Sequence, residues 1–185
     1  MMCSMRKFTI LALFFGLIFL CITPSIAQIE DSQPSADKPI RVFLSDSSAS
    51  FIPPVYFQKI DQEEALAYIH PGAFSSIQLK VVNEIPYTRI SEAVNEETMS
   101  AQGVKVLVRE DLTTLSGHQA VMFLLSYTVE NPENGTPINF ERLMLLTGTY
   151  NMTVWIDANY PVEARSLLYN VLRESLLSVE FLDKF

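Results

Sequence analysis

Four strand-like apolar runs follow one another closely between residues 104 and 158, and this arrangement constrains the fold more than any other feature. The runs read VKVLVREDL, HQAVMFLLSYTVE, FERLMLLTG and NMTVWIDA. They are separated by the turn sequences TTLSG, NPENGTP and TGTYN, with Asn134-Gly135 and Gly148 at two of the turns. Such short connections join antiparallel neighbours, because a parallel crossover needs a dozen or more residues. The sequence therefore predicts an antiparallel meander.

Two of these strands need cover on both faces of the sheet. Residues 120–125 and 143–146 are apolar at successive positions, so neither side of the strand is polar. A C-terminal helix over 162–179 supplies one cover, with Pro161 before it and a 3.6-residue apolar stripe formed by Leu167, Leu168, Val171, Leu172, Leu176 and Val179. A smaller helix is predicted from an N-cap at Ser91 to Gly103. The expected fold class is α+β, a three-layer α/β/α sandwich around a mainly antiparallel sheet, with the C-terminal helix packed on one face.

The first half of the domain predicts further strands. IRVFLS from Ile40, then ALAYIH and SSIQLKVVNEI, have the composition of strands, and Pro71-Gly72 marks the turn between the last two. In the last of them Ile77, Leu79 and Val81 alternate with polar residues, as in a half-buried strand. Pro53-Pro54 excludes a central strand at that position, since proline donates no backbone hydrogen bond.

The N-terminus has the pattern of an export signal. Arg6 and Lys7 precede an unbroken apolar run, ILALFFGLIFLCI, and Ser25 and Ala27 are small residues at the positions that a signal peptidase reads. Residues 1–27 are thus predicted to be a signal peptide cleaved between Ala27 and Gln28. The alternative is an uncleaved anchor, which the shortness of the run disfavours, since a spanning helix needs about 20 apolar residues.

The predicted mature chain consists of a tether and one domain. Residues 28–39 are polar and carry two prolines, and we interpret them as a flexible tether or as a disordered end without a role. Residues 40–185 are enough for a single domain with its own core. Both cysteines, Cys3 and Cys21, lie in the leader, and Leu20 before Cys21 argues against lipidation. The expected location is periplasmic or extracellular, without disulfides and without a membrane span after cleavage.

Charge and motif content exclude several classes of function. The chain has 13 basic and 21 acidic residues, and loss of the leader removes two of the basic ones. An acidic surface of this kind repels phosphate backbones, so nucleic acid is not an expected partner. With two histidines far apart in sequence and no cysteine in the mature chain, no zinc site is predicted, and neither calcium-loop nor phosphate-loop motifs occur. No metal and no cofactor are expected.

His118 is the histidine closest to a long apolar run, and it follows Gly117 at the entry to a strand. No G-x-S-x-G elbow accompanies it, and no acid partner is evident from the sequence, so a catalytic triad is not indicated. Alternation places its ring on the side of Ala120 and Met122, partly against apolar neighbours and partly in water. We therefore interpret His118 as non-catalytic.

The remaining candidates are carboxylates and aromatic residues. A pair of distant carboxylates could act in hydrolysis, and Glu110-Asp111, Glu141 and Asp157 qualify by residue type, although acids at strand ends are more often simply solvated. The run from Glu92 to Glu97 is interpreted as a solvated helix face. For binding, Trp155, Tyr150 and Tyr160 are the predicted residues, since Trp and Tyr combine a large apolar body with a hydrogen-bonding tip. The alternative for Trp155 is a place in the core beneath the terminal helix.

The order of elements resembles that of the superfamily that contains the photosystem II protein PsbP and the Mog-type Ran-binding proteins. The resemblance rests on the glycine-started strand LSGHQAVMFLLSYTV, the following FERLMLLTGTYNMTVWIDANYP, and a terminal helix ending LLSVEF with Ser178-Val179. It covers about Ile40 to Phe181 and matches the first half less well. It implies a binding or assembly protein and no shared catalytic residues.

These observations favour an exported, non-enzymatic binding or accessory protein whose partner is a protein or small ligand of the cell envelope. The alternative function is an exported hydrolase that uses distant carboxylates with His118 as a helper.

Overall fold

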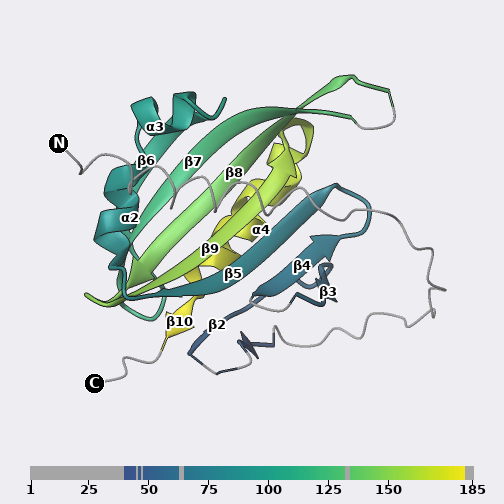
Figure 1. Cartoon of the computed structure of the whole chain (residues 1–185). Helices are drawn as coiled ribbons and strands as arrows, with labels where there is room; N and C mark the ends of the chain where they lie inside the picture. Colours follow the sequence, from purple (N-terminus) through teal and green to yellow (C-terminus); the bar gives the residue numbers. More distant parts are fainter. Residues whose placement is uncertain (1–39, 45, 47, 63–64, 132–133, 182–185) are drawn as a thin grey trace. The chain divides into compact units, whose positions relative to one another are not determined.

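The computed structural model describes residues 40–44, 46, 48–62, 65–131 and 134–181. The predicted signal peptide, the tether and their cleavage site lie outside these residues. The described chain folds into two antiparallel sheets and three α-helices. Figure 1 shows how these elements are arranged. None of the helices in this part of the chain has the length and apolar character needed to cross a bilayer.

The larger sheet has seven strands in the order β3-β4-β5-β9-β8-β7-β6. Its strands are β3 (Gln58–Ile60), β4 (Leu66–His70), β5 (Ser75–Asn83), β6 (Lys105–Thr113), β7 (Gln119–Glu130), β8 (Pro137–Gly148) and β9 (Met152–Pro161). Every pairing is antiparallel, so the predicted meander from β6 to β9 is confirmed. β9 then pairs with β5, which joins the two halves of the chain in one sheet.

The smaller sheet has three strands in the order β1-β2-β10. These are β1 (Val42–Phe43), β2 (Ala49–Phe51) and β10 (Glu180–Phe181). The strand predicted from Ile40 is therefore short and belongs to a different sheet from the meander. The residues that follow β2, including Pro53-Pro54, lie outside any strand, as the prolines require.

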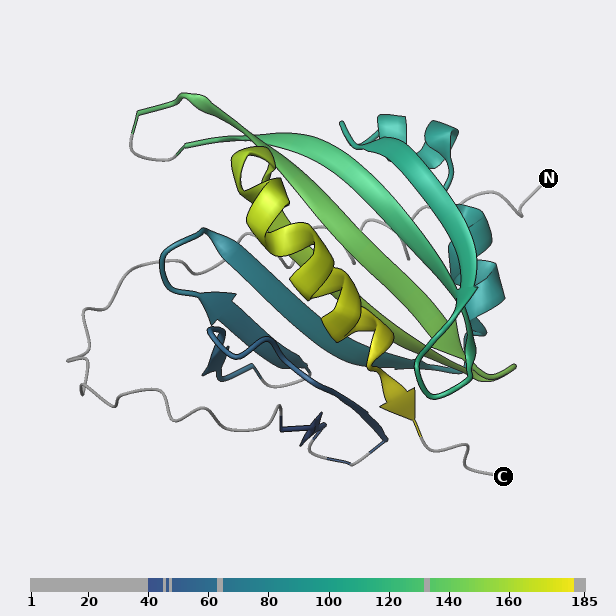
Figure 2. The same cartoon turned by 180° about the vertical axis from the view of Figure 1, so that it is seen from behind.

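The helix α4 (Arg165–Leu177) covers one face of the large sheet, which we call the α4 face (Figure 2). A 3-10 turn, η1 (Val162–Ala164), leads into it. Pairing places Leu143 opposite Ala158 and Leu145 opposite Ile156, and these side chains form the core with Leu168, Leu172 and Leu176 of α4. The docking of the C-terminal helix on the sheet is confirmed.

Two members of the predicted apolar stripe do not take part in this core. Leu167 is 76% exposed and Val171 is 45% exposed, whereas Leu172 is fully buried. Ser175 occupies a buried position on the helix in their place, and its hydroxyl donates to the carbonyl of Ile52 at 2.6 Å. Ser178 completes this contact, because its Oγ accepts from the backbone N–H of Ile52 at 2.8 Å. The chain after β2 is thus tied to the end of α4 by polar bonds.

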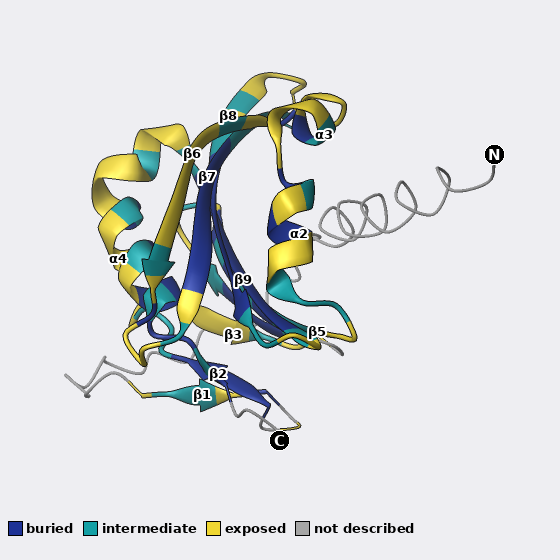
Figure 3. Ribbon diagram, turned by 90° about the vertical axis from the view of Figure 1, so that its left-hand side faces the viewer, coloured by how far each residue is buried: buried dark blue, intermediate teal, exposed yellow. Residues whose placement is uncertain are grey.

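The opposite face of the sheet, which we call the second face, is covered over part of its area by α2 (Tyr87–Ala93) and α3 (Glu96–Ser100). Figure 3 shows α4 and α2 on opposite sides of the sheet, so the three-layer arrangement is confirmed. The single helix predicted from Ser91 to Gly103 was wrong in its limits. Ser91 lies buried inside α2, and a new helix begins after Asn95, whose side chain and that of Thr98 form a capping box.

A tight turn joins β8 to β9. Gly148 has a φ of +139°, and a Cβ added there would lie 2.2 Å from the carbonyl oxygen of Met152. Because only glycine fits both the backbone angle and the space, this residue fixes where β8 ends and β9 returns. The turn thereby sets the register that decides which residues of β9 face α4.

Candidate functional site

A cluster of polar side chains lies on the second face of the large sheet, contributed by four adjacent strands. It contains Lys80 of β5, Tyr127 of β7, Arg142 of β8, and Trp155, Asp157 and Asn159 of β9. Pairing places Arg142 opposite Asn159 and Gln78 opposite Asp157. Since residues two apart on a strand share a face, Trp155, Asp157 and Asn159 all lie opposite the core-facing Ile156 and Ala158. We call these six residues the sheet cluster.

Asn159 is the centre of the hydrogen bonding. Its Oδ1 accepts from the hydroxyl of Tyr127 at 2.8 Å and from Nε of Arg142 at 2.7 Å. Its Nδ2 donates to Oδ1 of Asp157 at 3.4 Å and to Oγ of Ser76 at 3.5 Å. These partners fix the orientation of the amide, because acceptors lie on one side and donors on the other. Asn159 thus connects its own strand β9 to β5, β7 and β8 through side chains.

Asp157 is held by a second bond. The indole N–H of Trp155 donates to its Oδ2 at 2.9 Å, and the ammonium of Lys80 lies 4.5 Å from the centre of the Trp155 ring. Burial holds the pKa of Lys80 below its ordinary value, while the carboxylate of Asp157 opposes that effect and Arg142 reinforces it. Burial therefore disfavours the charged form of Lys80, and the indole face and the carboxylate of Asp157 offset part of that effect.

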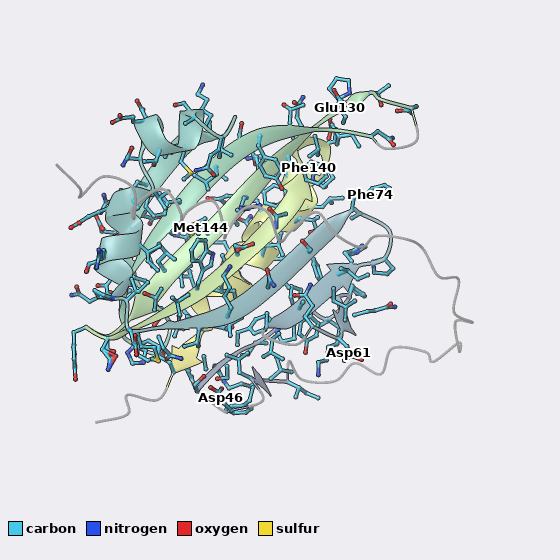
Figure 4. All side chains as sticks on the ribbon, viewed as in Figure 1. Asp46, Asp61, Phe74, Glu130, Phe140 and Met144 are labelled. Carbon is cyan, nitrogen blue, oxygen red and sulfur yellow. The ribbon has the colours of Figure 1, made fainter. Side chains whose placement is uncertain are left out.

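Tyr127 closes the other side of the cluster. Burial raises the pKa of its hydroxyl, and the adjacent Arg142 lowers it in part. The Arg142 guanidinium lies 5.3 Å from the centre of the Tyr127 ring, and Phe140 stacks on that ring at 5.7 Å between centres. The result is a row of planar groups, Arg142, Tyr127 and Phe140, along β7 and β8. Figure 4 shows Phe140 and Met144 on this face of β8.

The α4 face carries a separate polar group. The buried hydroxyl of Tyr160 donates to Oε2 of Glu141 at 2.8 Å, and Arg165 at the start of α4 pairs with Oε1 at 2.9 Å. Both carboxylate oxygens of Glu141 are therefore engaged. This group joins β8, β9 and α4, and its contacts are those of a structural ion pair rather than of a group directed into a cavity.

The expectation that Glu141 and Asp157 are solvated acids is wrong, since they are 3% and 2% exposed. They also lie on opposite faces of the sheet. Glu141 is paired with Tyr160, whose side chain lies in the core on the α4 face, whereas Asp157 stands between the core residues Ile156 and Ala158 of β9 and so lies on the second face. The body of the sheet separates the two carboxylates. Glu110 and Asp111 lie at the edge strand β6, where Glu110 bonds to Arg173 of α4 and Asp111 pairs with Arg109.

The structure places His118 just before β7, half-buried, with its backbone N–H bonded to Oγ1 of Thr114 at 3.1 Å. Its ring packs against that of Phe181, with 4.0 Å between ring centres. Within the described part of the chain no carboxylate is hydrogen-bonded to this imidazole. The expected contact of the ring with apolar neighbours is present, but the neighbour is on β10 rather than on β7.

The three aromatic residues predicted to bind a partner do not come together. Tyr150 lies in the turn between β8 and β9 with 87% of its surface exposed. Trp155 is buried on the second face and Tyr160 on the α4 face. Trp155 therefore does not lie beneath the terminal helix, contrary to the alternative for that residue. Among the described residues no three acidic, histidine or cysteine side chains are grouped as metal ligands would be.

Of the six residues of the sheet cluster, only Trp155 and Asp157 were candidates in the sequence; Lys80, Tyr127, Arg142 and Asn159 were not predicted. Lys80, Arg142 and Asn159 interrupt apolar strands at alternate positions, and this is the one local sign of a polar patch on an otherwise buried sheet. Their proximity to one another depends on the pairing of β5 with β9, strands that are about 70 residues apart in sequence. That pairing has no short-range sequence signal.

No family model and no curated protein matches the sequence. Solved structures do match, each with a TM-score slightly above 0.5. The Ran-binding protein Mog1p of Saccharomyces cerevisiae has a TM-score of 0.54 and 12% identity, and the match covers 78% of this chain and 95% of that one. The cyanobacterial PsbP of Synechocystis has a TM-score of 0.52 and 10% identity, and the match covers 82% and 98%.

Two further matches extend the comparison. LpqN, described as involved in cell envelope biogenesis of Mycobacterium tuberculosis, has a TM-score of 0.51 and 11% identity, with 76% and 88% covered. A protein from Bacteroides thetaiotaomicron has a TM-score of 0.51 and 11% identity, and this chain spans 48% of its length. At such identities the likeness concerns the fold alone. The α/β/α arrangement described above is the fold of Mog1p and PsbP, as the order of elements in the sequence predicted.

Proposed function

We propose that this chain is an exported, non-enzymatic binding or accessory protein. The observation that carries the proposal is the state of its buried acids: Glu141 and Asp157 lie on opposite faces of one sheet, each held by bonds within the protein. A pair of carboxylates that cleaves a bond must flank the same substrate, about 5–9.5 Å apart on one side. No contact among the described residues favours the alternative of a hydrolase with His118 as helper.

The surface that we propose for a partner is the part of the second face around Tyr127, Phe140 and Gln78. All three side chains are half-buried. Tyr127 belongs to the sheet cluster, Phe140 and Gln78 lie next to it, and no described helix packs over this part of the face (Figure 1). Tyrosine is enriched where proteins bind one another, and here the hydroxyl of Tyr127 is held by Asn159. Rigid side chains lose little conformational entropy when a partner binds. Tyr150, exposed at the far turn, is a separate proposed contact.

The proposed compartment and partner follow from the sequence and agree with the neighbours. The leader favours export, and the acidic balance of the chain disfavours nucleic acid. Mog1p, which shares this fold, is a Ran-binding protein, and LpqN, which also shares it, is involved in cell envelope biogenesis. For this chain we propose a protein or small ligand of the cell envelope.

Photo-crosslinking tests the surface. A benzoylphenylalanine placed at Phe140 is expected to form a discrete adduct in envelope extracts, because the ring lies on the proposed surface. The matched control carries the same group at Leu167, which is exposed on the other side of the sheet. The adduct from position 140 should disappear when Tyr127→Ala is added, and none should form from position 167. Equal adducts at the two positions, or none at position 140, would contradict the proposed surface.

The non-enzymatic part of the proposal has its own test. The purified mature chain is assayed against a panel of ester, peptide, phosphate and glycoside substrates beside Glu141→Gln and Asp157→Asn. We expect no turnover above that of the two variants. Turnover by the wild-type chain that either variant abolishes would establish the hydrolase instead.

A further inference from the structure

A cavity of about 420 Å³ lies between the small sheet and the turn that precedes β7, away from the sheet cluster. It is lined by aromatic and small hydroxyl-bearing residues together with one carboxylate: Phe43, Ser48, Ala49, Ser50, Ser116, His118, Glu180 and Phe181. Its volume falls in the range of pockets that hold small molecules, about 300–1,000 Å³. The inference drawn from it is independent of the function proposed above.

Aromatic rings form one part of the cavity wall. The centres of the His118 and Phe181 rings lie 4.0 Å apart with 32° between the ring planes, so the two rings are stacked and each covers one face of the other. Phe43 comes from β1, two strands away from Phe181, and is 56% exposed. The face of an aromatic ring carries partial negative charge and attracts groups with weakly positive hydrogens. The exposed ring of Phe43 therefore suits the C–H face of a ligand.

The hydroxyl groups of the cavity present acceptors more than donors. The hydroxyl of Ser48 donates to Oδ1 of Asp46 at 2.6 Å, and that of Ser116 donates to the carbonyl of Val179 at 2.9 Å. A serine whose proton is used in this way keeps lone pairs that accept. The carboxylate of Glu180 adds further acceptor positions beyond the Oε1 atom that contacts Arg41. A ligand for this cavity should therefore be rich in donors.

Charge restricts the ligand further. Arg41 pairs with Glu180 at 2.9 Å and also donates to Oγ of Ser50 at 3.2 Å, so the acid at the cavity already has a cation beside it. An organic cation would compete with Arg41, and an anion would meet the carboxylate of Glu180. A neutral ligand avoids both costs.

We propose that this cavity binds a neutral polyhydroxylated ring, that is, a sugar unit. Its hydroxyl groups would donate to Ser48, Ser116 and Glu180, and its C–H face would lie against the exposed ring of Phe43. The imidazole of His118, which makes no side-chain hydrogen bond within the described residues, supplies one donor and one acceptor in its neutral form.

The test is a titration of the ¹⁵N-labelled mature chain, followed by NMR, with D-glucose, D-galactose, D-mannose, N-acetylglucosamine and maltose. We expect at least one of these sugars to shift the amide signals of Ser116, His118 and Glu180 in a saturable manner. Phe43→Ala should weaken the binding at least tenfold, because it removes an exposed wall of the cavity. Ser116→Ala should weaken it less, since it removes one acceptor.

Two controls make the result decisive. Phe74→Ala removes another exposed ring, at the β4–β5 turn, and should leave sugar binding unchanged. Cyclohexanol and tetramethylammonium, as an apolar ring and an organic cation, should bind more weakly than the best sugar. The proposal fails if no sugar shifts these signals, if the shifts persist in Phe43→Ala, or if either control ligand binds more tightly. Circular dichroism verifies that each variant is folded.

Discussion

At the scale of single residues, Tyr160 shows how burial and bonding act together. Its side chain is fully buried, and its hydroxyl donates to Glu141, which is paired in turn with Arg165. Burial raises the pKa of Tyr160 above its ordinary value of 10.0, and the bond to Glu141 raises it further. The folded chain therefore keeps a proton on this hydroxyl at a pH where the unfolded chain has lost it. Tyr160 contributes to stability through its protonated form.

This difference predicts a loss of stability in alkali. Below pH 10 both states are protonated and the contribution is complete; above it the unfolded state loses its proton first and the free energy of unfolding falls. Tyr160→Phe should show a weaker decline of the urea midpoint between about pH 9.5 and 11.5. At pH 7 the same change should cost about 1–3 kcal/mol, because Glu141 loses a buried donor. The Phe variant having the same alkaline decline as the wild type would contradict this account.

At the scale of elements, α4 buries some residues of its apolar stripe and exposes others, although the sequence pattern predicts the same role for all of them. Leu168 and Leu172 enter the core with Leu176, while Leu167 and Val171 point away from it. α4 has 13 residues, and one of its buried positions is the polar Ser175. The apolar contact between the helix and the sheet is therefore narrower than the stripe in the sequence. The helix ends at Leu177, Ser178 caps it, and β10 begins at Glu180. Packing, rather than periodicity, therefore decides which side chains stabilise this element.

Paired substitutions on α4 measure this difference. Leu172→Ala removes a fully buried side chain and should lower the free energy of unfolding by about 2–5 kcal/mol. Leu167→Ala is the matched control, with the same chemistry at an exposed position, and should change stability by no more than about 0.5 kcal/mol. Urea denaturation of both variants gives the comparison. Similar losses in the two variants would mean that α4 is rotated relative to the arrangement described here.

At the scale of the whole molecule, one long-range pairing makes the fold. The strands β3, β4 and β5 begin the large sheet, the chain then passes through α2 and α3 to the opposite edge, and the meander β6 to β9 returns to β5. This closure joins Lys80 of β5 to Trp155 and Asp157 of β9. It also leaves the small sheet β1-β2-β10 to hold the two ends of the described chain together.

The predicted signal peptide, residues 1–27, lies outside the described residues, and its removal can be tested on the whole chain. Intact mass of the protein recovered from the exported fraction should correspond to a chain that begins at Gln28. Ala27→Pro should block cleavage, since it removes the small residue that the peptidase reads, and should leave the leader attached. A leader retained in the unaltered protein, or a lipid mass on Cys21, would overturn the predicted processing.

The sequence alone determined the antiparallel meander, the turn positions, the C-terminal helix and the layered α+β class. These depend on alternation, on turn residues such as Gly148 and on a 3.6-residue period, all of which are local. The break between α2 and α3 is also local, because the side chains of Asn95 and Thr98 form a capping box there. The exposure of Leu167 required tertiary contacts, because period alone does not say how wide a packed face is. The sheet cluster and the cavity beside His118 were likewise decided only by tertiary structure. Each joins residues from strands far apart in sequence, and strand register, which brings such residues together, is set by the packing of the whole sheet.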